Sequence, residues 1–159
     1  MKNISCCYTG HRDIPYEAIP VVYEKVLKKT EELINRGFRH FYTGGAVGFD
    51  MIALEALTRL KEVYPDIFIH IIVPCEGHTR HWGDNMKEKF SRLSQYADEV
   101  KCLSPFYFDG CMQVRNRYLV EHSCCCIAYL ERKSGGSAYT VSYAQRSGLT
   151  VINIAEDNN

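Results

Sequence analysis

The segment from Ile67 to Val73 is a nearly continuous run of β-branched side chains. Such a run is typical of a strand that is buried on both of its faces. A strand of this kind requires a layer of helices on each side of its sheet, because either face would otherwise be exposed to water. This one segment therefore restricts the chain to a small group of α/β architectures.

Strand patterns and helix patterns alternate along the rest of the chain. Five further strands are expected at 4–8, 38–42, 99–103, 123–130 and 150–154. The segments between them carry apolar residues at helical spacing. The alternation predicts a three-layer, Rossmann-like α/β fold with a mainly parallel sheet of about six strands. The 159 residues fit a single domain, in which we expect 154–159 to form a loose tail.

The composition narrows the choice of partners. Acidic and basic residues balance to a net charge of zero, so no overall field attracts nucleic acid or an anionic membrane. No apolar run reaches membrane-spanning length. The N-terminal Met1 is followed almost at once by a strand pattern, so no signal peptide is expected. We therefore expect a cytoplasmic protein without a membrane partner.

Eight cysteines are present, and most of them fall inside strand patterns. Cys6 and Cys7 are adjacent, as are the three cysteines at 124–126. Adjacent residues on a strand point to opposite faces of the sheet, and a free cysteine behaves as a small apolar residue. We interpret them as reduced thiols of the core. No C-x-x-C motif occurs, and no metal site is predicted.

Three turns, at 9–12, 43–50 and 134–140, each follow a predicted strand and are rich in glycine and hydroxyl side chains. The second and third turns lead into helices. Glycine allows the backbone to come close to a ligand, and the free N–H groups of a helix N-terminus favour an anion. In a parallel sheet all three turns lie at the same edge, where ligands of such folds bind. The pattern predicts an anion-binding site, with phosphate as the expected anion.

Several of these residues have a second interpretation. Asp50 suits a ribose hydroxyl, a cation or simple capping of its helix better than contact with a phosphate. Ser134 and its neighbours are either an anion cradle or a small-residue turn for close helix packing. Arg12 could bind a phosphate with two hydrogen bonds or be a solvated surface residue.

Two loops and one helix add further candidates. Trp82 could stack on a base or pack beneath its loop, and its polar loop at 75–81 is not interpreted as a metal site. Arg115 and Arg117 are two residues apart on a helix and cannot share a face; Arg115, with Asn116, is predicted to point inward. Tyr107 and Phe108 suggest a surface for contact between copies of the chain.

With these motifs together, the chain resembles the SLOG superfamily, the SMF/DprA and LOG-like Rossmann-type group, and specifically its YpsA-like branch. The matching pieces run in order along almost the whole chain: Thr9-Gly10-His11-Arg12, Thr43-Gly44-Gly45-Ala46-x-Gly48-Phe49-Asp50, Pro74 with Glu76 and Trp82, Arg115-Asn116-Arg117, and Ser134-Gly135-Gly136 with Thr140 and Tyr143-Ala144. The resemblance implies a Rossmann-like fold and a pocket for a nucleotide or a nucleotide-derived ligand.

The resemblance also bears on activity. LOG-type enzymes cleave the N-glycosidic bond of nucleoside monophosphates with an arginine and a glutamate that follows a Pro-Gly-Gly-x-Gly-Thr turn. Here Arg115 occupies the corresponding region, but the turn begins with Ser134, and Tyr143 stands near the position of the glutamate. A carboxylate for such a reaction would have to come from Asp50 or Glu76.

We therefore predict a domain that binds or senses a nucleotide, with an ADP-ribose-like or NAD-derived ligand as one form. The predicted ligand-binding residues are Thr9, Gly10, His11, Arg12, Thr43, Gly44, Gly45, Gly48, Asp50, Trp82, Arg115, Asn116, Ser134, Gly135, Gly136, Ser137 and Thr140. The first alternative is a hydrolase of a nucleotide's glycosidic bond that uses Arg115 with Asp50 or Glu76. The second is single-stranded nucleic-acid binding, as in DprA-like proteins, which the neutral charge disfavours.

Overall fold

The computed structural model describes residues 1–156 and contains one six-stranded parallel sheet. The strands are β1 (Ser5–Gly10), β2 (His40–Thr43), β3 (Phe68–Val73), β4 (Glu99–Cys102), β5 (Cys125–Tyr129) and β6 (Thr150–Asn153). Their spatial order is β4-β3-β2-β1-β5-β6, and every neighbouring pair is parallel. The predicted three-layer Rossmann-like fold is therefore confirmed.

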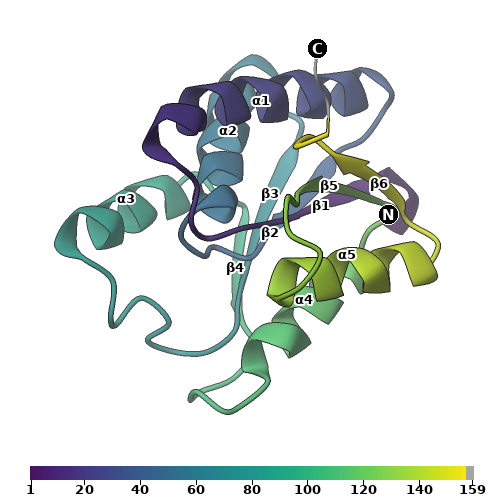
Figure 1. Ribbon diagram of the computed structural model, residues 1–159. Helices are drawn as coiled ribbons and strands as arrows, with labels where there is room; N and C mark the ends of the chain where they lie inside the picture. The colour runs from purple at the N-terminus through teal and green to yellow at the C-terminus, as the bar shows by residue number, and fades with distance from the viewer. Residues whose placement is uncertain (157–159) are drawn as a thin grey trace.

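Five α-helices connect the strands within this part of the chain: α1 (Ile19–Asn35), α2 (Phe49–Val63), α3 (Asp84–Ser94), α4 (Cys111–Glu121) and α5 (Gly136–Arg146). In Figure 1, α1 and α2 lie above the sheet and α4 and α5 lie below it. Helix α3 packs on the same side as α2, because its Leu93 belongs to the same buried cluster as Leu54. Both faces of the sheet are thus covered, as the apolar run in β3 requires.

The core consists of two apolar clusters, one on each face of the sheet. Cys6 belongs to the cluster beneath α1 and α2, whereas Cys7 belongs to the cluster beneath α4 and α5. Their opposite partners in β5, Cys125 and Cys126, divide between the clusters in the same way. All eight cysteines are free. The expectation that adjacent cysteines serve both faces of a buried strand is confirmed.

The described part of the expected loose tail, residues 154–156, is bonded to the fold: the Ala155 and Glu156 N–H groups donate to Asn153 oxygens at 3.1 and 3.2 Å. Ile154, which we had included in the loose tail, is fully buried, and its N–H donates to the Ala128 carbonyl at 2.8 Å. The Lys25 ammonium donates to the Ile154 carbonyl at 3.1 Å. Residues 157–159 of the expected tail lie outside the described residues.

The order of the strands reverses between β1 and β5. From β1 the chain adds β2, β3 and β4 on one side, and then returns to place β5 and β6 on the other. In open parallel sheets ligands bind beyond the carboxyl ends of the strands at such a point. The loops that follow β1 and β5 are two of the three glycine-containing turns, and the third follows β2. Among residues 1–156, no helix is both long enough and apolar enough to cross a membrane.

Candidate functional site

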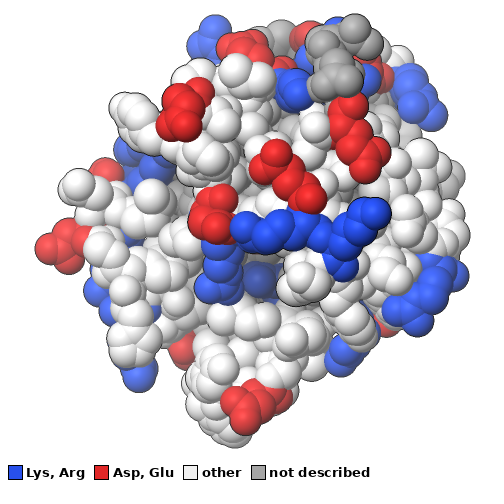
Figure 2. Space-filling view, viewed as in Figure 1, with Lys and Arg blue, Asp and Glu red and all other residues white. Residues whose placement is uncertain are grey.

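A cavity of about 350 Å³ lies at this reversal point. The loops after β1, β2 and β5 and the first turns of α4 and α5 form its walls. It is lined by Thr9, Gly10, His11, Arg12, Asp13, Ala46, Asp50, Met112, Gln113, Arg115, Asn116, Arg132, Ser134, Gly135, Gly136 and Ser137. Figure 2 shows Lys and Arg side chains gathered around a hollow near the centre of this face, bordered by acidic ones. We call this the first cavity.

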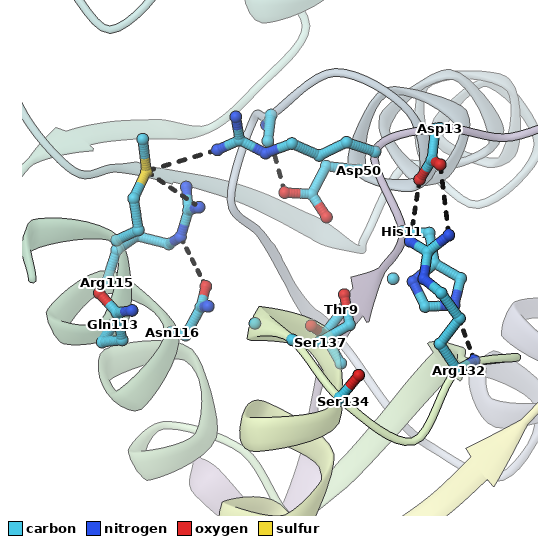
Figure 3. Close-up of a pocket in the computed structure, with 16 residues that line it drawn as sticks. Thr9, His11, Asp13, Asp50, Gln113, Arg115, Asn116, Arg132, Ser134 and Ser137 are labelled. Carbon is cyan, nitrogen blue, oxygen red and sulfur yellow. Dashed lines mark hydrogen bonds and ion pairs between the residues drawn. The ribbon is translucent and has the colours of Figure 1, made fainter.

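Hydroxyl groups and a helix N-terminus meet in the first cavity. Figure 3 shows Thr9, Ser134 and Ser137 close together, with Arg115 and Asn116 on α4 at one side and Arg132 at the other. Gly135 has a φ of +99° and precedes the first residue of α5. A Cβ atom added at Gly135 or Gly136 would meet no atom within 4 Å. The backbone is therefore open to a ligand where the N–H groups of a helix's first turn lack intrahelical acceptors.

The glycines of the second turn serve packing instead. Gly48 has a φ of +82°, and a Cβ there would lie 2.3 Å from the Arg12 carbonyl oxygen. A Cβ at Gly45 would press on Ile71 and Phe90, each at 3.0 Å. These two glycines allow the loop after β2 to pass close to the core and to the loop after β1.

Asp50 and Arg115 form hydrogen bonds with the backbone of this second turn. Asp50 Oδ2 accepts a hydrogen bond from the Ala46 N–H at 3.2 Å; Ala46 lies in the loop before α2, so this bond stabilises the loop. Arg115 donates to the Gly44 carbonyl oxygen and, at 3.5 Å, to that of Ile72. Gly44 lies between them, since its Cβ would be 2.7 Å from both the guanidinium and Asp50 Oδ2.

Burial shifts the pKa values of both side chains. Arg115 is 4% exposed and Asp50 is 8% exposed. Burial raises the pKa of Asp50, although the nearby Arg115 charge and the Ala46 N–H oppose this. Burial likewise lowers the pKa of Arg115, opposed by Asp50. The two groups therefore favour each other's charged forms in a site that disfavours isolated charge.

His11 connects the first and third turns. Its Nε2 accepts hydrogen bonds from the backbone N–H groups of Glu131 at 2.9 Å and Arg132 at 3.4 Å. Burial and the Arg132 charge lower the pKa of His11, which keeps the ring neutral and able to accept. Arg132 in turn makes a two-fold ion pair with Asp13, at 2.9 and 3.2 Å. These contacts fix the loop after β5 against the loop after β1.

The predicted site residues fall into three groups. Eleven of those named from the sequence line the first cavity: Thr9, Gly10, His11, Arg12, Asp50, Arg115, Asn116, Ser134, Gly135, Gly136 and Ser137. Five others lie outside its lining: Thr43, Gly44, Gly45, Gly48 and Thr140. Thr43 donates to the Asp50 carbonyl at 3.3 Å, and Thr140 donates to the Gly136 carbonyl at 3.0 Å. Both hydroxyls therefore have partners within the protein.

The third group lies in a second cavity. Trp82 and Glu76 line a space of about 420 Å³ formed by the loops after β3 and β4. Trp82 packs edge-on against Phe90, with ring centroids 5.7 Å apart, and it also lines this cavity. Tyr143, near the place of the LOG-type glutamate, donates its hydroxyl to Glu121 at 2.8 Å in an exposed position.

The sequence reasoning missed five residues of the first cavity: Asp13, Ala46, Met112, Gln113 and Arg132. Met112 and Gln113 stand three residues before Arg115 and Asn116, so helical spacing could have found them. Arg132 stands between a predicted strand, 123–130, and the third turn, which was also a usable signal. Within residues 1–156, no group of three or more His, Cys, Asp or Glu side chains is arranged to hold a metal ion.

The sequence model of the YpsA family, described as the YspA SLOG family, matches residues 11–152. The chain belongs to this family. A curated protein of similar sequence is the uncharacterized SPbeta prophage-derived protein YoqJ of Bacillus subtilis, 30% identical over 139 residues, which are 79% of this chain and 81% of YoqJ. The UPF0398 protein SERP1017 of Staphylococcus epidermidis is 27% identical over 67% of this chain and 59% of its own length.

Solved structures agree with the fold of this SLOG family domain. DNA processing protein A (DprA) of Streptococcus pneumoniae superposes with a TM-score of 0.65 and 17% identity, over 94% of this chain and 50% of that protein. TM1055 superposes with a TM-score of 0.60 and 13% identity, over 96% of this chain and 78% of TM1055. At these identities the likeness shows the fold alone.

Proposed function

We propose that the first cavity binds the phosphate group of a nucleotide or nucleotide-derived ligand, such as an ADP-ribose-like molecule. The observation that carries the proposal is the meeting of three hydroxyls, from Thr9, Ser134 and Ser137, with the open first turn of α5. Hydroxyls and free backbone N–H groups are donors that suit phosphate oxygens. Their position at the reversal of strand order is where such folds place a ligand.

Charge in the first cavity also favours an anion. Arg12 and Arg132 line it, and an arginine can donate two parallel hydrogen bonds to a phosphate. Arg132 already binds Asp13, so a ligand phosphate would compete with that carboxylate. The charges of Arg115 and Arg12 act on the Asp50 carboxylate, and they offset the repulsion that it would exert on an anion.

Calorimetric titration with ADP-ribose, AMP, NAD and ribose 5-phosphate tests the proposal. Gly136→Glu places a carboxylate at the start of α5, where added atoms meet open space, and should abolish binding by repulsion. Gly136→Gln, with the same shape but no charge, should weaken binding less. Thr9→Val removes one hydroxyl and should weaken binding roughly threefold to tenfold. The proposal fails if none of these compounds binds, or if Gly136→Glu binds as tightly as Gly136→Gln.

A second candidate function is hydrolysis of the ligand's glycosidic bond. The observation that favours it is a buried carboxyl, Asp50, which lines the first cavity and has a raised pKa. A raised pKa is typical of carboxyl groups that transfer protons in catalysis. Chromatography of nucleoside monophosphates and NAD after incubation should then show free base, and Asp50→Asn should remove it. Absence of free base at high protein concentration would exclude this function.

Nucleic-acid binding is a third candidate function, and it can be tested with the same purified protein. A DNA processing protein A from Helicobacter pylori, with a TM-score of 0.54 and 21% identity, is described by its single-stranded DNA binding mode. The chain has no net charge, and binding to a phosphate backbone would have to come from local arginines. Such binding should weaken steeply with salt, and its absence at low salt would remove this candidate.

A further inference from the structure

The second cavity, of about 420 Å³, lies beside the first at the same edge of the sheet. Its walls come from the loop after β3 (Cys75, Glu76, Gly77, His78, Arg80, His81 and Trp82), the loop after β4 (Pro105, Phe106 and Tyr107), and Arg12 and Met112. The Glu76 N–H donates to the Ser104 carbonyl at 2.9 Å, which joins the two loops. The cavity is thus bounded by loops that are tied to each other.

Arg12 and Met112 separate the two cavities, because both side chains line each of them. Their only recorded mutual contact in the described structure is Arg12 Nη2 to Met112 Sδ at 3.5 Å, and a thioether is a weak acceptor. A gap of about 30 Å³ between the cavities is lined by these two residues and by Ala46, Pro74, His78, Trp82 and Arg115. Arg12 and Met112 have long, flexible side chains with a weak mutual contact, so a ligand can move them apart.

The second cavity is rich in aromatic surface. The rings of Phe106 and Tyr107 are in residues that are 66% and 64% exposed. Trp82 is held in place, because its ring meets His78 edge-on with centroids 5.3 Å apart. Exposed aromatic side chains beside a cavity favour a flat, unsaturated ligand group that can stack on them.

One buried polar atom in this wall has no partner. His78 Nε2 is buried and makes no hydrogen bond within residues 1–156. Burial lowers the pKa of His78, a hydrogen bond between its ring and the Gly45 backbone opposes this, and the Arg115 charge lowers the pKa further. Buried polar atoms in folded proteins are nearly always hydrogen-bonded. Since His78 lines the second cavity, its Nε2 is a candidate partner for a polar ligand atom.

We propose that the second cavity holds the nucleobase of the same ligand whose phosphate occupies the first cavity. The ligand then passes between Arg12 and Met112, its base lies against the rings of Trp82 and Tyr107, and a polar atom of the base pairs with His78 Nε2. This inference rests on the proposed function and extends it, because it requires a ligand that carries both a phosphate and a base.

The single tryptophan of the chain provides a direct test, since Trp82 lines the second cavity. The probes are ADP-ribose, which carries a base, and ribose 5-phosphate, which does not. ADP-ribose should change the tryptophan fluorescence on binding, and ribose 5-phosphate should bind without changing it. Tyr107→Ala should weaken ADP-ribose binding roughly tenfold to a hundredfold, the range for loss of one stacked base, and leave ribose 5-phosphate binding unchanged.

Tyr96→Ala is the matched control. Tyr96 is 53% exposed and lies in the connection from α3 to β4, at the amino edge of the sheet, so its loss should affect neither probe. The inference is overturned, while the proposed function stands, if ribose 5-phosphate binds but ADP-ribose binds no more tightly and leaves the fluorescence unchanged. It is also overturned if Tyr107→Ala weakens both probes equally or neither. If neither probe binds in calorimetry, both proposals fail.

Discussion

Gly48 offers a measurable test of how the first cavity is built. Gly48→Ala adds one methyl group at a backbone with φ +82° and ψ −127°, a conformation that side chains disfavour. The added Cβ would lie 2.3 Å from the Arg12 carbonyl oxygen. A left-handed φ costs about 1–2 kcal/mol, and overpacking adds about 1–3 kcal/mol. The free energy of unfolding should therefore fall by about 2–5 kcal/mol.

Gly37→Ala separates these two costs. Gly37 ends α1 with a φ of +101°, but a Cβ there would meet no atom within 4 Å. Gly37→Ala should therefore lower the free energy of unfolding only by the backbone term, about 1–2 kcal/mol. Urea unfolding, followed by far-ultraviolet circular dichroism, measures both variants. Because the clash falls on Arg12, Gly48→Ala should also weaken nucleotide binding, whereas Gly37→Ala should not. Equal losses of stability in the two variants would refute the close approach of the loops.

Two further predictions concern the residues that hold the cavity in shape. Arg115→Ala removes the donor to the Gly44 carbonyl and leaves Asp50 without its cationic neighbour, so the free energy of unfolding should fall by about 3–5 kcal/mol. Arg117→Ala, on the same helix, should change the free energy of unfolding by no more than about 0.5 kcal/mol. Similar melting temperatures for the Arg115→Ala and Arg117→Ala variants in calorimetry would contradict a stabilising role of buried Arg115. For His11, whose folded-state pKa is lowered, the unfolded chain binds more protons, so stability should fall as the pH drops below the ordinary value of about 6.5. His11→Gln should show a shallower loss between pH 7.5 and 5.5 in urea titrations, and an unchanged slope would count against a neutral His11.

The layered fold could be predicted from the sequence because its signals are local. The β-branched run of β3 indicates that both faces of the sheet are covered, and Gly37 predicts where α1 ends. Hydrophobic periodicity and turn residues are patterns within a few residues, so they can be recognised without knowledge of tertiary contacts. The order of the strands, β4-β3-β2-β1-β5-β6, was not predicted, because right-handed connections are compatible with more than one order.

The site was predicted less completely, because its contacts join distant segments. The sequence shows that Gly45 and Gly48 are glycines, but not that they make room for Ile71, Phe90 and the Arg12 carbonyl. It likewise gives no sign that Arg115 would donate to a carbonyl 71 residues away. A side chain that faces a ligand and one that braces a loop are of the same residue type. Only the packed structure distinguishes them.

The residues that hold the loops of the first cavity in place act mainly on backbone atoms. Arg115 binds the Gly44 carbonyl, His11 binds the N–H groups of residues 131 and 132, and Gly48 makes room for the Arg12 carbonyl. Every residue type except proline offers the same backbone groups. The side chains that face the cavity at Gln113, Ser134 and Ser137 can therefore be exchanged during evolution without loosening the loops. Such a scaffold can acquire a new ligand specificity while its architecture stays constant.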